Sequence, residues 1–154
     1  MPGQTPLTSS RKPRVFIDAD VLFAGSAAPS EYGASLVVLR MAEITLLEAY
    51  TCRQVIIETE RNLVAKLPRV LPAFQLIVDR CLRVVPDPQP NQVKVYTGLA
   101  NKIDLPILVS ALQHECPWLV TFNIRHYQPG YPEVSVLSPV DFLLRVRDLL
   151  VRLG

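Results

Sequence analysis

The sequence has little cysteine, little net charge and no long apolar run, and each shortage excludes a class of protein. The three cysteines, Cys52, Cys81 and Cys116, lie far apart and form no Cys-x-x-Cys pair, which argues against a disulfide framework and a thiolate zinc site. Sixteen Lys and Arg against fourteen Asp and Glu give a net charge of +2, so any surface that binds nucleic acid must be local. Charge or proline interrupts every apolar run well short of the roughly 20 residues that cross a bilayer. We therefore expect a soluble, cytoplasmic protein.

The residues that are present suffice for one domain. The chain has 154 residues, 49% of them apolar, which is enough to bury a sizeable core. Residues 1–13 are rich in Pro, Ser and Thr and contain no apolar run that could act as a signal sequence. The sequence thus predicts a flexible tail over residues 1–13 and one domain over residues 14–154.

Strand-like and helix-like segments alternate along this domain. Short apolar segments between charged or turn residues predict strands at 15–17, 45–50, 83–85, 118–121 and 134–137. Apolar residues at helical spacing, with prolines near several ends, predict helices at about 34–44, 55–67, 72–81, 91–101, 104–115 and 139–150. This order implies a parallel sheet covered by helices on both faces. In such sheets ligands bind beyond the carboxyl ends of the strands.

Oxygen-bearing side chains stand at several of these strand ends. Asp18 directly follows the first predicted strand and Asp20 lies two residues further on, whereas Glu58 lies near the start of the helix after the second strand. Asp104 opens a later helix, and Asn123 follows the fourth strand by two residues. Taken alone, Asp18 is better explained as a turn residue, and Asp104 is equally well explained as a helix cap. Side chains with oxygen ligands recur at four strand-to-helix connections on the same edge of the sheet, and this recurrence points instead to a shared site.

Such a cluster is unfavourable by itself, because neighbouring carboxylates repel and raise one another's pKa. A hard divalent cation removes this conflict. Carboxylate, amide and water oxygens suit Mg²⁺, with Mn²⁺ as a possible substitute, and a cluster without His or Cys has little to recruit Zn²⁺.

Glu58 and Glu60 cannot both serve this site. Residues two apart on a helix point about 200° away from each other. Glu60 is spaced to lie beside Leu63 and Val64, whereas Glu58 lies nearer the helix start and the strand ends. We therefore assign Glu58 to the site.

Five segments match a known pattern: 15–23 (Val-Phe-Ile-Asp-Ala-Asp-Val-Leu-Phe), 58–63 (Glu-Thr-Glu-Arg-Asn-Leu), 104–112 (Asp-Leu-Pro-Ile-Leu-Val-Ser-Ala-Leu), 119–123 (Leu-Val-Thr-Phe-Asn) and 138–143 (Ser-Pro-Val-Asp-Phe-Leu). Through them, over roughly residues 14–150, the chain resembles the PIN-domain ribonucleases, and among these the VapC-like toxin branch. Two positions depart from the family pattern. Asn123 stands where many members have Asp, and His126 stands where a related stretch usually has Asp.

The resemblance implies a PIN-like three-layer α/β/α domain with a central parallel sheet of about four to five strands. It also implies a Mg²⁺-dependent endoribonuclease, in which Asp18, Glu58 and Asp104 hold one or two ions directly or through water. Asn123 and Thr121 would orient ligands or water by hydrogen bonds. The expected partners are an RNA substrate, a small antitoxin protein and a second copy of the chain in a homodimer.

Positively charged side chains near the predicted site, Arg61, Lys102, Arg125 and His126, could contact RNA phosphates. Asp20 would support the site without binding the ion.

Two other interpretations remain open at this point. A non-catalytic PIN module that binds RNA or a protein is favoured by Asn123 and His126. A haloacid-dehalogenase-like phosphohydrolase also places an Asp-x-Asp, here Asp18 and Asp20, after an apolar strand, with Lys102 and Asp104 in later roles.

Overall fold

Five short strands form one all-parallel sheet in the computed structural model, which describes residues 12–28 and 33–153. The strands are β1 (Arg14–Ile17), β2 (Glu48–Cys52), β3 (Leu82–Val85), β4 (Trp118–Val120) and β5 (Ser135–Leu137). Their order across the sheet is β3-β2-β1-β4-β5, and every neighbouring pair is parallel. The predicted tail lies, apart from residues 12 and 13, outside the described residues.

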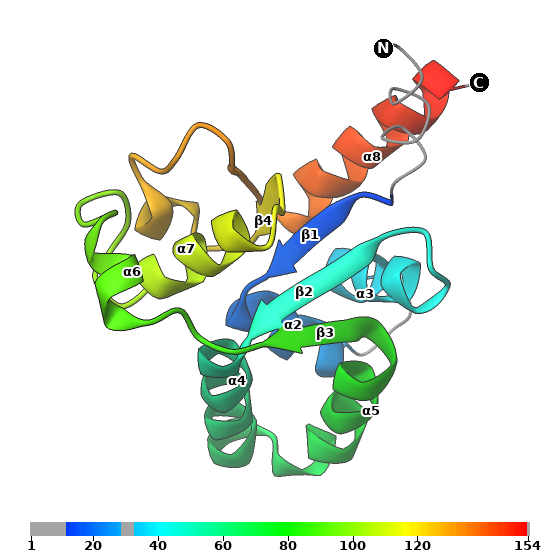
Figure 1. The fold of residues 1–154 in the computed structure, drawn as a ribbon. Helices are drawn as coiled ribbons and strands as arrows, with labels where there is room; N and C mark the ends of the chain where they lie inside the picture. Colours follow the sequence, from blue (N-terminus) through cyan, green and yellow to red (C-terminus); the bar gives the residue numbers. More distant parts are fainter. Residues whose placement is uncertain (1–11, 29–32, 154) are drawn as a thin grey trace.

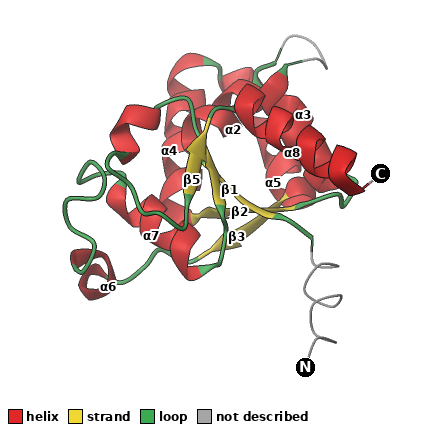
Figure 2. Ribbon diagram, turned by 90° about the horizontal axis from the view of Figure 1, so that it is seen from above, coloured by secondary structure: helices red, strands yellow, loops and turns green. Residues whose placement is uncertain are grey.

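Helices cover both faces of this sheet and confirm the predicted three-layer architecture (Figures 1 and 2). The helices of the described chain are α2 (Ala19–Ser26), α3 (Ala34–Glu43), α4 (Arg53–Lys66), α5 (Leu71–Cys81), α6 (Pro90–Lys94), α7 (Leu105–Gln113) and α8 (Pro139–Leu153). Helices α2, α3, α4, α5 and α8 gather on one side, and α6 and α7 lie on the other (Figure 2). None of the helices in the described ranges is both long and apolar enough to cross a membrane.

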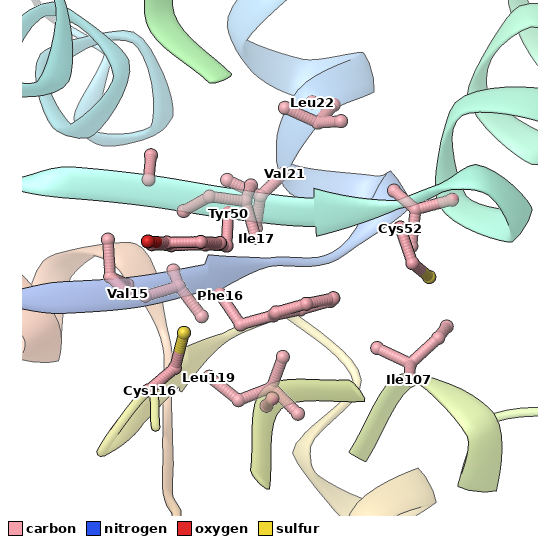
Figure 3. Packing of buried hydrophobic residues seen from close by; sticks show 14 of the residues in the cluster. Val15, Phe16, Ile17, Val21, Leu22, Tyr50, Cys52, Ile107, Cys116 and Leu119 are labelled. Atoms are coloured by element: carbon pink, nitrogen blue, oxygen red, sulfur yellow. The ribbon is translucent and has the colours of Figure 1, made fainter. Parts of the chain in front are cut away.

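The central strand β1 explains why its sequence is apolar without alternation. Val15, Phe16 and Ile17 are all fully buried, because each face of a parallel sheet packs against helices. Phe16 points towards Ile107 of α7 and Leu119 of β4, whereas Ile17 lies on the side of α2 (Figure 3). The core therefore fixes the end of β1, and with it the position of Asp18, from both sides.

The prediction missed one helix and placed two element boundaries wrongly. The sequence analysis assigned no helix to the small-residue segment after Asp18, which forms α2. The second strand begins at Glu48 rather than at Thr45, because Thr45 adopts a positive φ of 64° in the turn after α3. Helix α6 ends at Lys94, and turns follow it up to Gly98, whose φ is 95°. Glycine tolerates this conformation at little cost.

Candidate active site

A cavity of about 450 Å³ opens at the carboxyl end of the sheet. Its walls contain all four residues that the sequence analysis assigned to the site, together with Asp20. The lining residues are Asp18, Asp20, Glu58, Asn101, Lys102, Ile103, Asp104, Asn123 and His126. They come from the ends of three strands and from the loop before α7, as the topology requires for parallel strands that share one edge.

Asp18 is the most rigidly held of the acids. It is 6% exposed and caps α2, with Oδ1 accepting a hydrogen bond of 2.7 Å from the Ala19 amide. Its Oδ2 accepts hydrogen bonds from the hydroxyls of Thr121 (2.9 Å) and Tyr127 (2.8 Å). A carboxylate has about four acceptor positions, so three are used within the protein and about one remains for a ligand.

Asp20 is tied to the corner after β4. Its Oδ2 accepts hydrogen bonds from the Phe122 amide at 2.9 Å and from Asn123 Nδ2 at 3.0 Å. The Thr121 hydroxyl lies 3.2 Å from the same oxygen. That hydroxyl accepts a hydrogen bond from the Asn123 amide at 3.0 Å, so Thr121 joins the two corners. Asp20 and Asn123 therefore form one hydrogen-bonded unit at the cavity wall.

Glu58 reaches the cavity from the second turn of α4, and Asp104 from the residue before α7. His126 Nδ1 lies 3.2 Å from Asp104 Oδ2. The imidazole of His126 thus faces a carboxylate. Asp104 makes no side-chain capping hydrogen bond to α7, so the capping role weighed for it in the sequence analysis is not seen.

The electrostatics of the cavity are those of crowded carboxylates. Burial and the neighbouring charge of Asp18 raise the pKa of Asp20 to about 6. Burial, followed by the charges of Asp18, Asp104 and Asp20, raises the pKa of Glu58. Burial and Asp18 also raise the pKa of Asp104, although His126 opposes the shift. The charge of Asp18 therefore makes it harder for Asp20, Glu58 and Asp104 to ionise.

The donor chemistry fits a hard cation. The cavity presents carboxylate and amide oxygens, and Asp18 retains an acceptor position. Within residues 12–28 and 33–153, however, no group of three or more His, Cys, Asp or Glu side chains is arranged to hold a metal ion directly. Mg²⁺ usually keeps several of its waters and binds proteins through one or two carboxylates.

The alternative residue Glu60 is half-buried on α4 and is not among the cavity residues. Of the basic residues singled out in the sequence, Lys102 and His126 line the cavity and Arg61 and Arg125 do not. Arg61 still acts on the site, because its charge lowers the pKa of Glu58.

Tyr127 is the residue that sequence reasoning missed. Its hydroxyl is buried against Asp18, and burial together with that carboxylate raises the pKa of Tyr127 far above its usual range. The phenol is therefore a permanent hydrogen-bond donor to Asp18. A tyrosine seven residues after a strand carries no sequence signal for this role.

Comparisons with known proteins agree with this geometry. The family model described as PIN domain matches residues 14–125, so the chain belongs to the PIN-domain family. A sequence comparison with curated proteins finds no match.

Two solved structures share the fold. One is VapBC2 from Rickettsia felis bound to a DNA fragment from its promoter, at 12% identity and a TM-score of 0.58, covering 80% of this chain and 96% of that one. The other is VapC20 from Mycobacterium tuberculosis, a toxin that cleaves the sarcin-ricin loop, at 14% identity and a TM-score of 0.55, covering 78% and 98%. The chain therefore has a PIN fold like that of VapC proteins, and the family match removes the haloacid-dehalogenase-like alternative.

Proposed function

We propose that the chain is a divalent-metal-dependent endoribonuclease that hydrolyses RNA phosphodiester bonds, with Mg²⁺ as the first choice of ion and Mn²⁺ as a substitute. The observation that carries the proposal is the convergence of Asp18, Asp20, Glu58 and Asp104 on one cavity of a PIN domain. Burial, together with the charge of Asp18, raises the pKa of Asp20, Glu58 and Asp104, so added positive charge in the cavity would favour their ionised forms. A bound divalent ion supplies that charge, activates water and stabilises charge on phosphate oxygens.

The residues divide this work according to their contacts. Asp18, Glu58 and Asp104 would hold the ion, and the three hydrogen bonds on Asp18 keep its carboxylate fixed. Asn123 and Thr121 would act through Asp20, which both contact. These residues would fix the position of Asp20 beside the ion-binding acids without touching the ion themselves.

Lys102 and His126 stand on the cavity wall as donors for an RNA phosphate. Lys102 is exposed, and it makes no ion pair with a residue in the described ranges. A phosphate that approaches the carboxylates would therefore meet positive charge beside them.

The proposed biological setting is a toxin–antitoxin pair. Its support is the structural likeness to a VapC toxin that cleaves the sarcin-ricin loop and to a VapBC complex on promoter DNA. On this proposal a small antitoxin protein covers the acidic cavity, and the active chain is a homodimer in the cytoplasm.

A second candidate is a PIN module that binds RNA or a protein without cleaving it. The observation that favours it is the fourth corner, where Asn123 supplies an amide and His126 an imidazole instead of carboxylates. The acidic cavity would then be a remnant that binds a cation but does not perform chemistry.

Cleavage of a labelled single-stranded RNA separates the two candidates. The parent protein is compared with Asp18→Asn, prepared in the same way and shown to be folded by circular dichroism. Cleavage that requires Mg²⁺ and is lost in Asp18→Asn supports the nuclease. RNA binding by both proteins without cleavage by either supports the binding module.

A further inference from the structure

A second cavity, of about 660 Å³, lies next to the acidic one on the far side of Lys102. It is enclosed by the segment after β3, by α6 and the turns that follow it, and by the start of α7. Its walls are largely apolar and include Pro88, Pro90, Val93 and Leu105. The volume is within the roughly 300–1,000 Å³ of sites that take small molecules.

The two cavities share part of their wall. Lys102 lines both of them, and Gln54 of the second cavity donates a hydrogen bond of 2.9 Å from Nε2 to the carbonyl of Ile103, which lines the first. Ile103 is 75% exposed. Lys102 and the exposed side chain of Ile103 therefore stand between the two cavities.

The charge of the second cavity suits a ligand with phosphates. Lys94 and Lys102 are exposed on its walls, and neither forms an ion pair with a side chain in the described parts of the chain. The acid present, Asp87, already accepts a hydrogen bond of 2.8 Å from the Gln54 amide at the start of α4. The positive end of that helix offsets part of its charge.

We infer that the second cavity is a subsite for the nucleoside adjacent to the scissile phosphate of single-stranded RNA. In this assignment Lys102 contacts the phosphate that joins the two cavities, and Lys94 contacts the next phosphate along the strand. The base packs on the proline and valine walls, which accept any base because every base has an apolar face. Gln54 and Thr97 supply polar groups for its edge. The ligand is an unpaired nucleotide, since a base within a duplex cannot enter a pocket. This inference rests on the proposed function.

RNA binding without cleavage tests the subsite. A short fluorescent single-stranded RNA is titrated in Mg²⁺ onto the full chain carrying Glu58→Gln, and anisotropy gives the Kd. Lys94→Glu is added to this background, and Lys66→Glu is the matched control, because Lys66 lies at the other end of α4 and lines neither cavity. We expect Lys94→Glu to weaken binding by about fivefold or more and Lys66→Glu by less than about twofold, with a smaller salt dependence only for Lys94→Glu.

An abasic scan of the same RNA tests whether a base enters the cavity. One abasic position should weaken binding by about fivefold or more, because that RNA would lose the base that packs on the proline and valine walls. Equal effects of the two lysine variants, or equal tolerance of every abasic position, would overturn the subsite and leave the cavity to a protein partner. Cleavage by the chain with Glu58 intact is scored separately. If cleavage is retained but the subsite tests fail, only the subsite is refuted. If the subsite tests succeed but no cleavage is seen, the proposed nuclease function is refuted.

Discussion

At the amino end of the sheet, Glu48 lies between Arg14 and Arg83, whereas at the carboxyl end four carboxylates share one cavity. The Glu48 oxygens lie 3.3 Å from Arg14 Nε and 2.8 Å from Arg83 Nη2. Both guanidinium groups also lie over the Tyr50 ring, 5.5 Å and 5.8 Å from its centroid. Charges of opposite sign are thus paired at the amino end, and no ligand is needed to balance them.

The carboxyl end has the opposite arrangement. Burial and the charge of Asp18 raise the pKa of Asp20, Glu58 and Asp104, and His126 beside Asp104 is a partner that carries charge only when protonated. A protein gains no stability from crowded carboxylates. The first cluster therefore balances its own charge, whereas the second is the one that we propose serves a ligand.

Substitution of Glu58 should produce the largest effect. Glu58→Gln removes one of the carboxylates that would hold the ion and should lower Mg²⁺-dependent RNA cleavage by about 100-fold or more, since the charge stabilisation supplied by a metal amounts to several kcal/mol. The fold should remain intact. Initial rates of cleavage under the same conditions measure the effect.

The matched controls lie on the same helix and at the other end of the sheet. Glu60→Gln and Glu48→Gln should both cleave RNA within about threefold of the parent rate, because neither residue lines the acidic cavity. A threefold difference corresponds to less than about 1 kcal/mol. If Glu60→Gln were the inactive variant, the assignment of the helical acid would be wrong by two residues.

Metal affinity should rise with pH between about 5 and about 7.5. A proton on Asp20 removes negative charge beside the three acids that would hold the ion, and burial and Asp18 raise the pKa of Asp20 from 3.8 to about 6. In the metal-free chain the same raised pKa makes stability fall, rather than rise, as the pH increases. The stability contributed by protonated Asp20 is fully present below about 3.8 and is lost as the pH rises through about 6. Calorimetric titration with Mg²⁺ and thermal unfolding without it test the two signs, and an affinity independent of pH would contradict the account.

Asn123→Asp should tighten Mg²⁺ binding by about threefold to tenfold, since a carboxylate adds the negative charge that the amide lacks. Without metal the same variant should be less stable, because Asn123 Nδ2 donates a hydrogen bond of 3.0 Å to Asp20 and a second carboxylate would repel it. Asn91→Asp, at an exposed site on α6, is the control. Unchanged affinity in Asn123→Asp would return Asn123 to the role of a turn residue.

Glu48→Gln should have the smallest effect. The loss of its charge leaves Arg14 and Arg83 without their full partner and should lower the free energy of unfolding by about 1 kcal/mol, as partly exposed ion pairs do. Urea denaturation measures the change. A similar loss in the presence and absence of Mg²⁺ would confirm that this end of the sheet has no part in metal binding.

The sequence was sufficient for the sheet and for the convergence of the acids. Asp18, Glu58 and Asn123 follow the ends of β1, β2 and β4, and parallel strands bring such positions to one edge whatever the details between them. Asp104 precedes α7 and lines the same cavity. Boundaries were less predictable. The segment 19–26 is short and ends in small residues, so no helix was assigned to it, but Asp18 caps it as one.

Other features depended on tertiary contacts that no local pattern reports. Tyr127 reaches Asp18 across 109 positions of sequence. Ile44 lies at the end of a predicted helix and Leu46 in a predicted strand, yet they are 63% and 54% exposed in the turn between α3 and β2. The second cavity exists because the chain turns at residues 95–100 rather than continuing α6.

The most direct test of the account is the change in melting temperature that Mg²⁺ produces in three proteins: the parent, Asp18→Asn and Glu48→Gln. An ion that binds only the folded state at about 100 times its Kd adds about 2.7 kcal/mol, and each 1 kcal/mol is worth about 2–4 °C in a domain of this size. The parent and Glu48→Gln should therefore gain several degrees. Asp18→Asn should lose most of that gain, while its metal-free stability stays equal to the parent's or exceeds it. Equal stabilisation of all three proteins by Mg²⁺ would contradict the claim that the unpaired acids at the carboxyl end form a metal site.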